Sequence, residues 1–289
     1  MQFLIAKAYE VYRLFKFNFK LKVQQRSYFL KFDKRDQCDI EVGGEDVKFV
    51  TKDWFAKKWF YPRYGKGQMH EPNMTKALVQ EMTEHGVSPV FFDVGSNLGY
   101  YTCVVGCTNS TAHIESFEMH KKYADLQGQS VKLNKLNNVS INTVAVGENE
   151  NHINGPKLLT PNSGLSITSS VAKFSSQDFD QVSLSTFCED RSLEIDVAKI
   201  DVEGAEMGVL KGMEKMLDGP KAMTLFVEIH PEKLKSFGFK SIDVLNFLRS
   251  KRFSLSILPD HRDLNAIVSP LLKSQPPLLL NTMVIARRT

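Results

Sequence analysis

Cysteine is scarce in this 289-residue chain, and its placement excludes two common uses of the residue. The four cysteines are Cys38, Cys103, Cys107 and Cys188, and no pair has C-x-x-C spacing. This number is too small for a secreted fold stapled by disulfides. Cys103 and Cys107 stand one helical turn apart, which indicates a packed helix face rather than a zinc site. We assign no metal ligands on this basis.

Long apolar runs are also missing. No uninterrupted apolar stretch approaches the roughly 18 residues of a membrane span, and Lys7 and Glu10 interrupt the apolar residues of segment 1–14. That segment therefore lacks the pattern of a signal peptide. With 42% hydrophobic and 24% charged residues, the composition is typical of a globular protein. We expect a cytoplasmic protein that associates with membranes only at their surface, if at all.

Positive charge is concentrated at the N-terminus. Residues 1–35 carry nine Lys and Arg against two acidic residues, a net charge of +7, whereas the rest of the chain is at −3. Within them, "FKFNFKLKV" at 15–23 alternates apolar and polar residues with the period of a strand. The segment is either a small appended layer with solvated lysines or a basic patch that approaches an anionic membrane. Nucleic acid is not expected, because no recognised binding motif accompanies the charge.

The remaining sequence alternates strands with helices. A hairpin is predicted at 38–51 around Gly43 and Gly44, and Asn73 is predicted to cap a helix that ends at Gly86. Strands are expected at 90–94, 112–118, 139–145, 196–201, 223–229, 253–258 and 281–286, with helices from about 97, at 121–135, from about 204 and at 241–250. This order predicts an α/β protein with a mostly parallel, doubly wound sheet. We place a basic N-terminal layer at 1–70, the α/β domain at 71–289 and a surface excursion at 147–180.

One tight turn stands out in "VFFDVGSNLGYYTCVVG", residues 90–106. A buried strand ends near Asp93, Gly95 and Gly99 flank three other residues, and a helix follows. Asn97 and Tyr100 stand where the dinucleotide fingerprint requires glycine, so a pyrophosphate would not rest on this backbone. The turn is either a structural corner or a site for an adenosine ligand with a carboxylate, such as S-adenosylmethionine.

Acidic residues end four of the predicted strands: Asp93, Glu118, Asp201 and Glu228. Ligands bind outside the carboxyl ends of the strands in open parallel sheets. Glu118 lies about 20 residues beyond the turn, where a carboxylate can accept hydrogen bonds from both ribose hydroxyls. The four acids together predict a negative pocket, which favours a sulfonium cation over a nicotinamide dinucleotide.

These motifs resemble the FkbM family of S-adenosylmethionine-dependent methyltransferases. The similarity covers roughly 70–258 and includes "EP" at Glu71, "FFDVGSNLGYYT", "SFEM", "NSGLSI", "AKIDVEGAEMGVLKGM" and "VEIHP". The resemblance implies a Rossmann-like class I methyltransferase fold and methylation of a hydroxyl on a sugar, glycolipid or other small molecule. His120 departs from the family pattern, which usually has proline there.

The resemblance also implies roles for individual residues. The cofactor site would comprise Glu71, Asp93, Gly95, Ser96, Asn97, Gly99, Glu118 and Asp201. Asp201 would lie beside the reactive methyl group, and Glu203 and Glu206 would open the next helix on one shared face. Glu206 is better explained as an acid in the first turn of a helix.

The general base and the class of reaction stay open on the sequence. His230 follows a strand end and has an ordinary pKa close to neutrality, while Asp201 and Glu203 are the other candidate catalytic residues. A divalent metal held by Asp201, Glu228 and His230 is an alternative, as is an inactive methyltransferase fold used for interactions. Amide or base methylation is not favoured, since "DVEG" stands where an Asn-Pro-Pro-Tyr motif would be.

Overall fold

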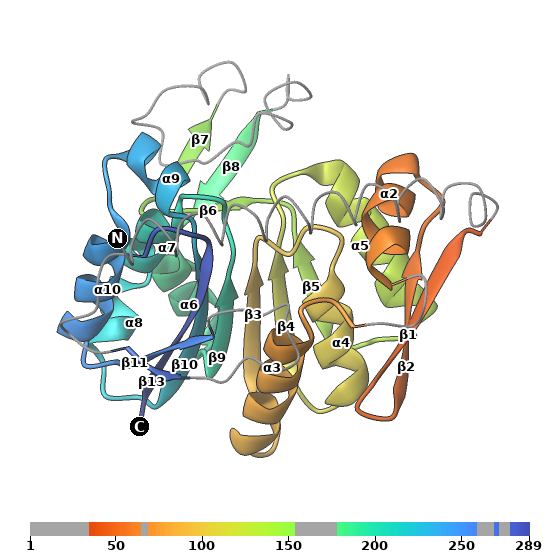
Figure 1. Ribbon diagram of the computed structural model, residues 1–289, viewed down its shortest axis with the longest axis horizontal. Helices are drawn as coiled ribbons and strands as arrows, with labels where there is room; N and C mark the ends of the chain where they lie inside the picture. Colours follow the sequence, from red (N-terminus) through yellow and green to blue (C-terminus); the bar gives the residue numbers. More distant parts are fainter. Residues whose placement is uncertain (1–34, 65–68, 154–177, 259–268, 272–277) are drawn as a thin grey trace, which may run out of the picture. The chain divides into compact units, whose positions relative to one another are not determined.

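The structure is a computed structural model that describes residues 35–64, 69–153, 178–258, 269–271 and 278–289 (Figure 1). The chain divides into two compact units, Met1–His70 and Glu71–Thr289. The predicted basic strand at 15–23 and most of the predicted surface excursion lie outside the described residues. None of the described helices combines the length and apolar character that a bilayer crossing requires. The membrane contact expected of residues 1–35 stays a prediction.

The described part of the first unit is a hairpin followed by a helix. Strands β1 (Gln37–Val42) and β2 (Glu45–Val50) pair antiparallel around Gly43 and Gly44, whose positive φ values of 62° and 86° suit a two-residue hairpin loop. The predicted hairpin is therefore confirmed. Helix α2 (Trp54–Tyr64) was not predicted. It packs Phe60 on Phe49 of β2, with ring centroids 4.6 Å apart.

The second unit is built on an eight-stranded sheet in the order β12-β11-β13-β10-β9-β3-β4-β5. The strands are β3 (Val90–Val94), β4 (His113–Phe117), β5 (Val139–Asn142), β9 (Val197–Ile200), β10 (Met223–Ile229), β11 (Ser254–Leu258), β12 (Ser269–Pro270) and β13 (Thr282–Arg288). Five strands from β10 to β5 pair parallel, and β13 pairs antiparallel to both neighbours. The predicted mostly parallel, doubly wound sheet is confirmed.

Helices connect the parallel strands, as alternating strands and helices predict. Helix α3 (Pro72–Glu84) precedes β3. The helices between later strands are α4 (Tyr100–Thr108), α5 (Lys121–Leu133), α6 (Leu184–Arg191), α7 (Glu206–Gly212), α8 (Glu214–Asp218), α9 (Pro231–Leu234) and α10 (Ser241–Ser250). A small second sheet pairs β6 (Ala145–Val146) and β7 (Asn151–Ile153) with β8 (Phe179–Val182). Every residue of β9 and β10 is buried, so the middle of the main sheet is the centre of the core.

The strand order reverses between β3 and β9. From β3 the chain first adds β4 and β5 on one side, and then returns to add β9 and β10 on the other. In open α/β sheets the crevice at such a reversal, at the carboxyl ends of the strands, is where ligands bind. Asp93 and Lys199 are register partners across this strand pair. The fold therefore directs attention to the ends of β3 and β9.

Several local predictions were wrong. The strand expected at 139–145 is two strands in different sheets, β5 and β6. Asn73 does not cap a helix: α3 begins at Pro72 after Glu71, whose φ of 42° is left-handed. Pro72 is favoured at a first helical position because its missing N–H costs nothing there. The helix expected from about 204 begins only at Glu206, because Glu203 and Gly204 both have positive φ.

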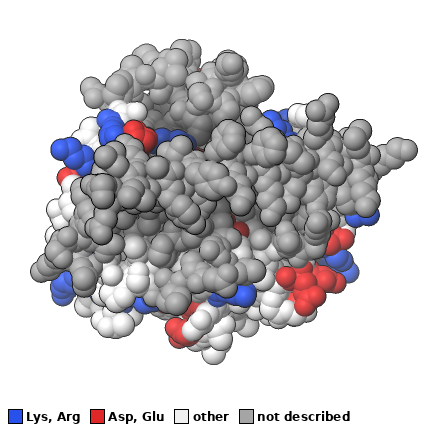
Figure 2. All heavy atoms as spheres, viewed as in Figure 1, with Lys and Arg blue, Asp and Glu red and all other residues white. Residues whose placement is uncertain are grey.

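The described surface carries both signs of charge. Figure 2 shows Lys and Arg side chains interspersed with Asp and Glu around the described edge of one face. Exposed ion pairs such as Lys215–Glu189 at 2.9 Å and Lys121–Asp125 at 2.8 Å each contribute only about 0–1 kcal/mol. The charges that matter for function are the buried ones at the strand ends.

A substitution at Gly95 tests how closely the backbone after β3 approaches the backbone after β9. Its φ is +77°, and an added Cβ would lie 2.0 Å from the carbonyl oxygen of Asp201. Gly86 is a matched control, since its φ is +85° and a Cβ there would contact nothing within 4 Å. We expect Gly86→Ala to lower the free energy of unfolding by about 1–2 kcal/mol from backbone strain. Gly95→Ala should cost about 1–3 kcal/mol more from overpacking. Denaturant unfolding measures both, and equal losses would contradict the close approach.

Candidate active site

The turn from Gly95 to Gly99 is held mainly by hydrogen bonds within the protein. Four of its backbone N–H groups already have acceptors, those of Gly95, Ser96, Asn97 and Gly99. The first two donate to the carbonyl oxygen of Phe117, each at 3.0 Å, and Asn97 donates to Glu118 at 2.9 Å. The turn is thus not the open cluster of N–H donors that the glycine spacing suggested. Its three left-handed residues, Gly95, Asn97 and Gly99, instead fit it tightly against the end of β4.

Glu118 is fixed at the end of β4 with its carboxylate held from two sides. It accepts hydrogen bonds from the N–H groups of Asn97 at 2.9 Å and His120 at 2.8 Å. Burial outweighs these bonds and raises the pKa of Glu118 to about 7. Each carboxylate oxygen has a further lone pair for another donor. The ribose contact expected of this carboxylate stays a prediction.

Asp93 has a structural task at the end of β3. It is fully buried, and one of its oxygens accepts hydrogen bonds from the N–H of Thr102 at 3.0 Å and from its hydroxyl at 2.7 Å. Thr102 is in the first turn of α4, where N–H groups lack helical partners. Burial raises the pKa of Asp93, although Lys199 opposes the rise. Asp93 therefore anchors α4, and its expected direct contact with the cofactor stays a prediction.

Lys199 is a central residue that the motif analysis missed. Its side chain is 3% exposed, and its Nζ lies 3.4 Å from Asp201 and 3.8 Å from Asp93. It also lies 5.1 Å from the ring centroid of Tyr101. Burial alone lowers a lysine pKa, but the carboxylates of Asp201 and Asp93 outweigh it and raise the pKa of Lys199. The signal in the sequence was a lysine inside an otherwise apolar strand, two residues before an acid.

Asp201 lies at the end of β9 between two cationic groups. One carboxylate oxygen is 3.4 Å from Lys199 Nζ and the other is 3.8 Å from His230 Nε2. Burial opposes ionisation, yet Lys199 and His230 hold the pKa of Asp201 below its usual range. Glu71 acts on the same group electrostatically and accepts a hydrogen bond from the Tyr101 hydroxyl at 2.8 Å. The structure thus brings Glu71 and Asp201, predicted from distant motifs, to one place.

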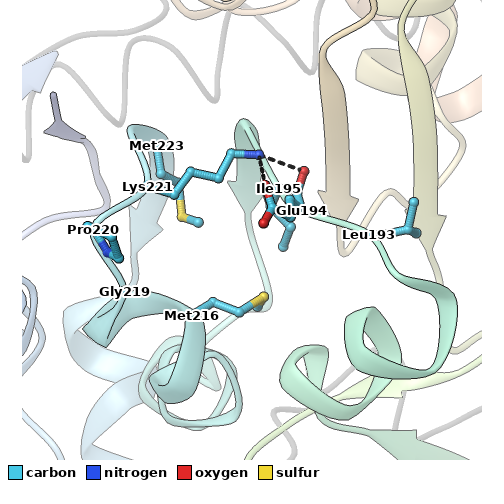
Figure 3. A pocket seen from close by; sticks show the side chains of 8 residues that line it. All are labelled: Leu193, Glu194, Ile195, Met216, Gly219, Pro220, Lys221 and Met223. Atoms are coloured by element: carbon cyan, nitrogen blue, oxygen red, sulfur yellow. Dashed lines mark hydrogen bonds and ion pairs between the residues drawn. The ribbon is translucent and has the colours of Figure 1, made fainter.

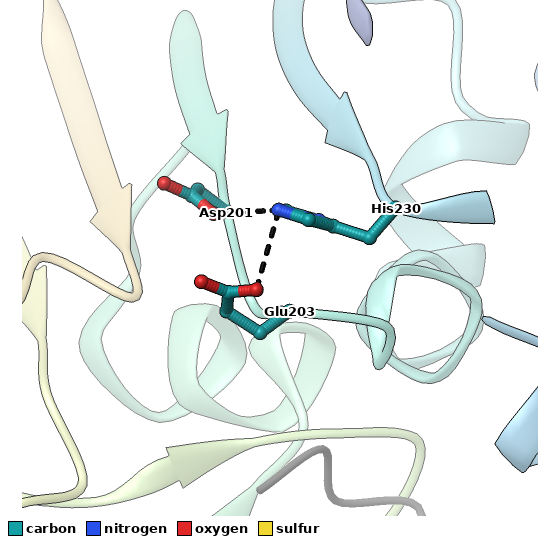
Figure 4. Close-up of side chains that lie close together, drawn as sticks. All are labelled: Asp201, Glu203 and His230. Carbon is teal, nitrogen blue, oxygen red and sulfur yellow. Dashed lines mark ion pairs between the residues drawn. The ribbon is translucent and has the colours of Figure 1, made fainter. Parts of the chain in front are cut away.

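His230 and its acidic neighbours form a second cluster beside Asp201. Figure 4 shows His230, from the end of β10, pointing at Asp201 and Glu203. Its Nε2 lies 3.4 Å from Glu203, 3.8 Å from Asp201 and 3.8 Å from Glu228. Its Nδ1 lies 2.7 Å from Glu206. All three residues predicted to be catalytic therefore meet at the carboxyl ends of β9 and β10.

Glu206 orients this cluster from within the core. It is fully buried, and the same oxygen that contacts His230 Nδ1 accepts a hydrogen bond from the N–H of Gly204 at 2.8 Å. Glu203 precedes the helix with a φ of 56°. The expectation that Glu203 and Glu206 share one helical face is therefore wrong, because the chain turns between them. Glu206 fixes the imidazole ring, which is more than a helix-first-turn acid does.

The surroundings of His230 argue against its expected role as general base. Burial alone would lower its pKa, but the hydrogen bond with Glu206 and the charges of Asp201 and Glu228 raise the pKa to about 9. In this arrangement the ring is an imidazolium at neutral pH. A protonated ring cannot accept a second proton. Asp201 and Glu203 are left as the candidate proton acceptors.

The residues present fit S-adenosylmethionine. Glu118 and Asp201 follow β4 and β9, the two strands on either side of β3, and a group of acids at this edge of the sheet favours a sulfonium cation. The turn also holds the side-chain oxygen Oδ1 of Asn97, which is buried and has no hydrogen-bond partner in the described part of the chain. A ligand donor beside the turn would satisfy this oxygen, because buried polar atoms are rarely left unpaired.

A pocket elsewhere in the unit is not part of this site. It lies at the amino ends of β9 and β10, the end of the sheet opposite to Asp201, and includes Ile195, Met216 and Met223. Figure 3 shows Lys221 reaching across it toward Glu194, to which it is joined by an ion pair of 3.4 Å. It contains none of the strand-end acids. We therefore assign the active site from the positions of the strand-end acids and not from this pocket.

Comparison with known proteins now identifies the class. The model of the methyltransferase FkbM domain matches residues 93–255, a segment that runs from the end of β3 to β11 and contains all four strand-end acids but not Glu71. The protein is an S-adenosylmethionine-dependent methyltransferase with a Rossmann-like class I fold. It belongs to the FkbM methyltransferase family.

Solved structures with a similar fold are distant in sequence. An O-methyltransferase from Bacillus cereus is 10% identical, with a TM-score of 0.44 over 76% of this chain and 80% of that one. The precorrin-6y C5,15-methyltransferase from Geobacter metallireducens is 9% identical, with a TM-score of 0.42 over 74% and 87%. No curated protein sequence matches the chain. The family match and the strand order therefore carry the assignment.

Glu118 predicts a pH dependence of cofactor affinity. Only its ionised form can accept hydrogen bonds from both ribose hydroxyls, and its pKa is about 7. The ionised fraction falls about tenfold between pH 8 and pH 6, so affinity should fall by up to about tenfold over that range. Calorimetric titration at pH 6, 7 and 8 measures it. Glu118→Gln should bind more weakly and with little pH dependence, and a flat profile for the unaltered protein would rule out the ribose contact.

Lys199 predicts a large effect on stability. In Lys199→Met the carboxylates of Asp93 and Asp201 lose their buried cation, which should cost about 3–5 kcal/mol of unfolding free energy at pH 8. The loss should be smaller at pH 5, because the unpaired acids then have raised pKa values and take up protons. Lys211→Met is the control, since its ion pair with Glu148 is partly exposed. Equal effects of the two substitutions in urea unfolding would contradict the role of Lys199.

Proposed function

We propose that the protein methylates a hydroxyl oxygen of a neutral acceptor, most simply a sugar, a glycolipid or another hydroxyl-rich small molecule. One observation carries the proposal: the Asp201 carboxylate is partly open, with its side chain 28% exposed, at the strand end that borders the cofactor crevice. A hydroxyl must lose its proton when it becomes an ether. Asp201 is placed to accept that proton.

The low pKa of Asp201 suits a late proton transfer. S-adenosylmethionine supplies a methyl group activated by its sulfonium charge. The acceptor oxygen gains positive charge as it forms its new bond, and it then becomes a far stronger acid than a carboxylic acid. A weakly basic carboxylate is sufficient at that stage. Before it, Asp201 aligns the hydroxyl by accepting its hydrogen bond, and such alignment can contribute on the order of 7–11 kcal/mol at best.

The charge of the site supports a neutral acceptor. Glu71, Asp201, Glu203 and Glu228 surround the crevice, whereas the two buried cations Lys199 and His230 are already in contact with carboxylates. A phosphate or a nucleic acid backbone would be repelled by these acids. Sugar hydroxyls are donors, and carboxylate oxygens are their natural acceptors. Glu203, with a side chain 42% exposed, can bind a hydroxyl next to the one that is methylated.

Substitutions of Glu118 and of Asp201 should change different kinetic quantities. Glu118→Ala removes a contact to ribose, which changes little during transfer, so it should weaken cofactor affinity and leave kcat largely intact. Asp201→Asn removes the proton acceptor and its charge, so it should lower kcat by about 10²-fold or more with a small effect on cofactor affinity. Steady-state kinetics with a panel of neutral glycosides and a cofactor titration separate the two effects.

Asp125→Asn serves as the control, because Asp125 is exposed on α5 and pairs with Lys121; it should change neither quantity. Cofactor binding without turnover on any hydroxyl acceptor would indicate a different acceptor class. A folded protein that binds neither the cofactor nor its demethylated product would support the interaction-protein alternative instead.

A further inference from the structure

We propose that Asp201, Glu203 and His230 bind a divalent cation of the Mn²⁺ type at the carboxyl ends of β9 and β10. Each residue offers one ligand atom, and the three atoms lie within 4.8 Å of one another. Two carboxylate oxygens and an imidazole nitrogen at such separations can contact a common ion. Figure 4 shows Asp201 and Glu203, from the loop after β9, facing His230, which follows β10.

The orientation of His230 is independent support for the site. The ring is 2% exposed, and its Nδ1 is 2.7 Å from the fully buried Glu206. Its Nε2 points at Asp201 and Glu203 but forms no hydrogen bond within the described residues, its distances to their oxygens being 3.8 Å and 3.4 Å. Metal-binding histidines almost always have this arrangement, with a carboxylate on one nitrogen and the ion on the other.

The backbone at Glu203 explains how its side chain reaches His230. Its φ of 56° is left-handed, a conformation that is uncommon for a residue other than glycine. Gly204 follows with a φ of 111°, and a Cβ there would lie 2.7 Å from Lys233. The chain therefore turns sharply between β9 and α7. This turn leaves Glu203 facing His230 instead of continuing into the helix.

The balance of charge favours a cation. Asp201, Glu203, Glu206 and Glu228 lie around His230. An ion bound at Nε2 replaces the proton of the ring there, so binding releases this proton and keeps a positive charge among the carboxylates. A ligand set of two carboxylates and one imidazole is harder than a zinc–thiolate site and softer than the all-oxygen sites of Mg²⁺, so Mn²⁺ is the suitable probe. Three protein ligands leave coordination positions open for water or an acceptor hydroxyl.

Lys233 would compete with the ion for the carboxylate of Glu203. Its Nζ contacts the Glu203 oxygen Oε2, the same oxygen that faces His230. The lysine side chain is 38% exposed and flexible, so it can move away when an ion binds. Removing its charge should therefore tighten ion binding, whereas a purely structural cluster would show no such response.

The existence of the site does not depend on the proposed function, but its role does. If the protein methylates a hydroxyl, an ion at Asp201 and Glu203 would lie beside the acceptor and lower the pKa of its hydroxyl, and Asp201 would then act as a ligand of the ion instead of the direct proton acceptor. Ion binding is therefore measured without methyl donor or acceptor. Its failure and the failure of hydroxyl methylation can then be told apart.

The test is a titration of the chelator-treated full chain with Mn²⁺, followed by electron paramagnetic resonance of the free ion and by calorimetry. We expect one site per chain. Glu203→Gln, at a partly exposed position, should weaken binding at least tenfold, and Glu206→Gln should weaken it about 10–100-fold through His230. Lys233→Met should strengthen it severalfold. Glu232→Gln is the matched control, because Glu232 is exposed and pairs with Lys235; it should bind like the unaltered protein.

Thermal unfolding of each variant without metal shows whether it is folded. Failure of the folded, unaltered protein to bind Mn²⁺ at submillimolar concentration would overturn the proposal. Binding that survives Glu203→Gln, or that is unaffected by Lys233→Met, would overturn it as well. Saturable binding lost in Glu203→Gln, kept in Glu232→Gln and tightened in Lys233→Met would support it, whether or not any acceptor is methylated.

Discussion

The ammonium group of Lys199, buried between the carboxylates of Asp93 and Asp201, is the interaction on which the site depends. It neutralises negative charge where the strand order of the sheet reverses. Two acids can therefore lie at the ends of neighbouring strands. Asp93 uses its position to hold the first turn of α4. Asp201 uses its position to face the crevice. The ammonium group of Lys199 thus stabilises both Asp93, which holds the helix after the glycine turn, and Asp201, the proposed proton acceptor.

Much of the fold was predictable because its signals are local. The strands at 90–94 and 223–229 and the helix at 241–250 have the predicted bounds, since apolar runs and periodic faces mark them directly. The hairpin turn at Gly43 and Gly44 followed from residue type. The first turn of α3 was misjudged because Asn73 is a good capping residue, whereas the proline before it already fixed the helix start.

The residues that form the site could be predicted from the sequence, but the contacts between them could not. Strand-end acids and the family motifs placed Asp201, Glu203 and His230 together. Periodicity could not show that Glu203 adopts a left-handed backbone, and so it wrongly put that residue on the face of Glu206. The ordinary pKa of histidine suggested a base, whereas three carboxylates, those of Asp201 and Glu206 after β9 and that of Glu228 on β10, stabilise the charged ring. These are long-range effects, which a short stretch of sequence does not contain.

The position of β13 has a consequence for how the molecule is made. In the main sheet, β11 and β12 are joined to the parallel strands only through β13, although β11 precedes it in the chain. While the protein is being synthesised, β10 must remain an open edge and β11 has no place in the sheet until residues 282–288 emerge. Unpaired edges are templates for association with other chains. A nascent or truncated chain that lacks β13 would thus keep its parallel strands and expose the edge of β10.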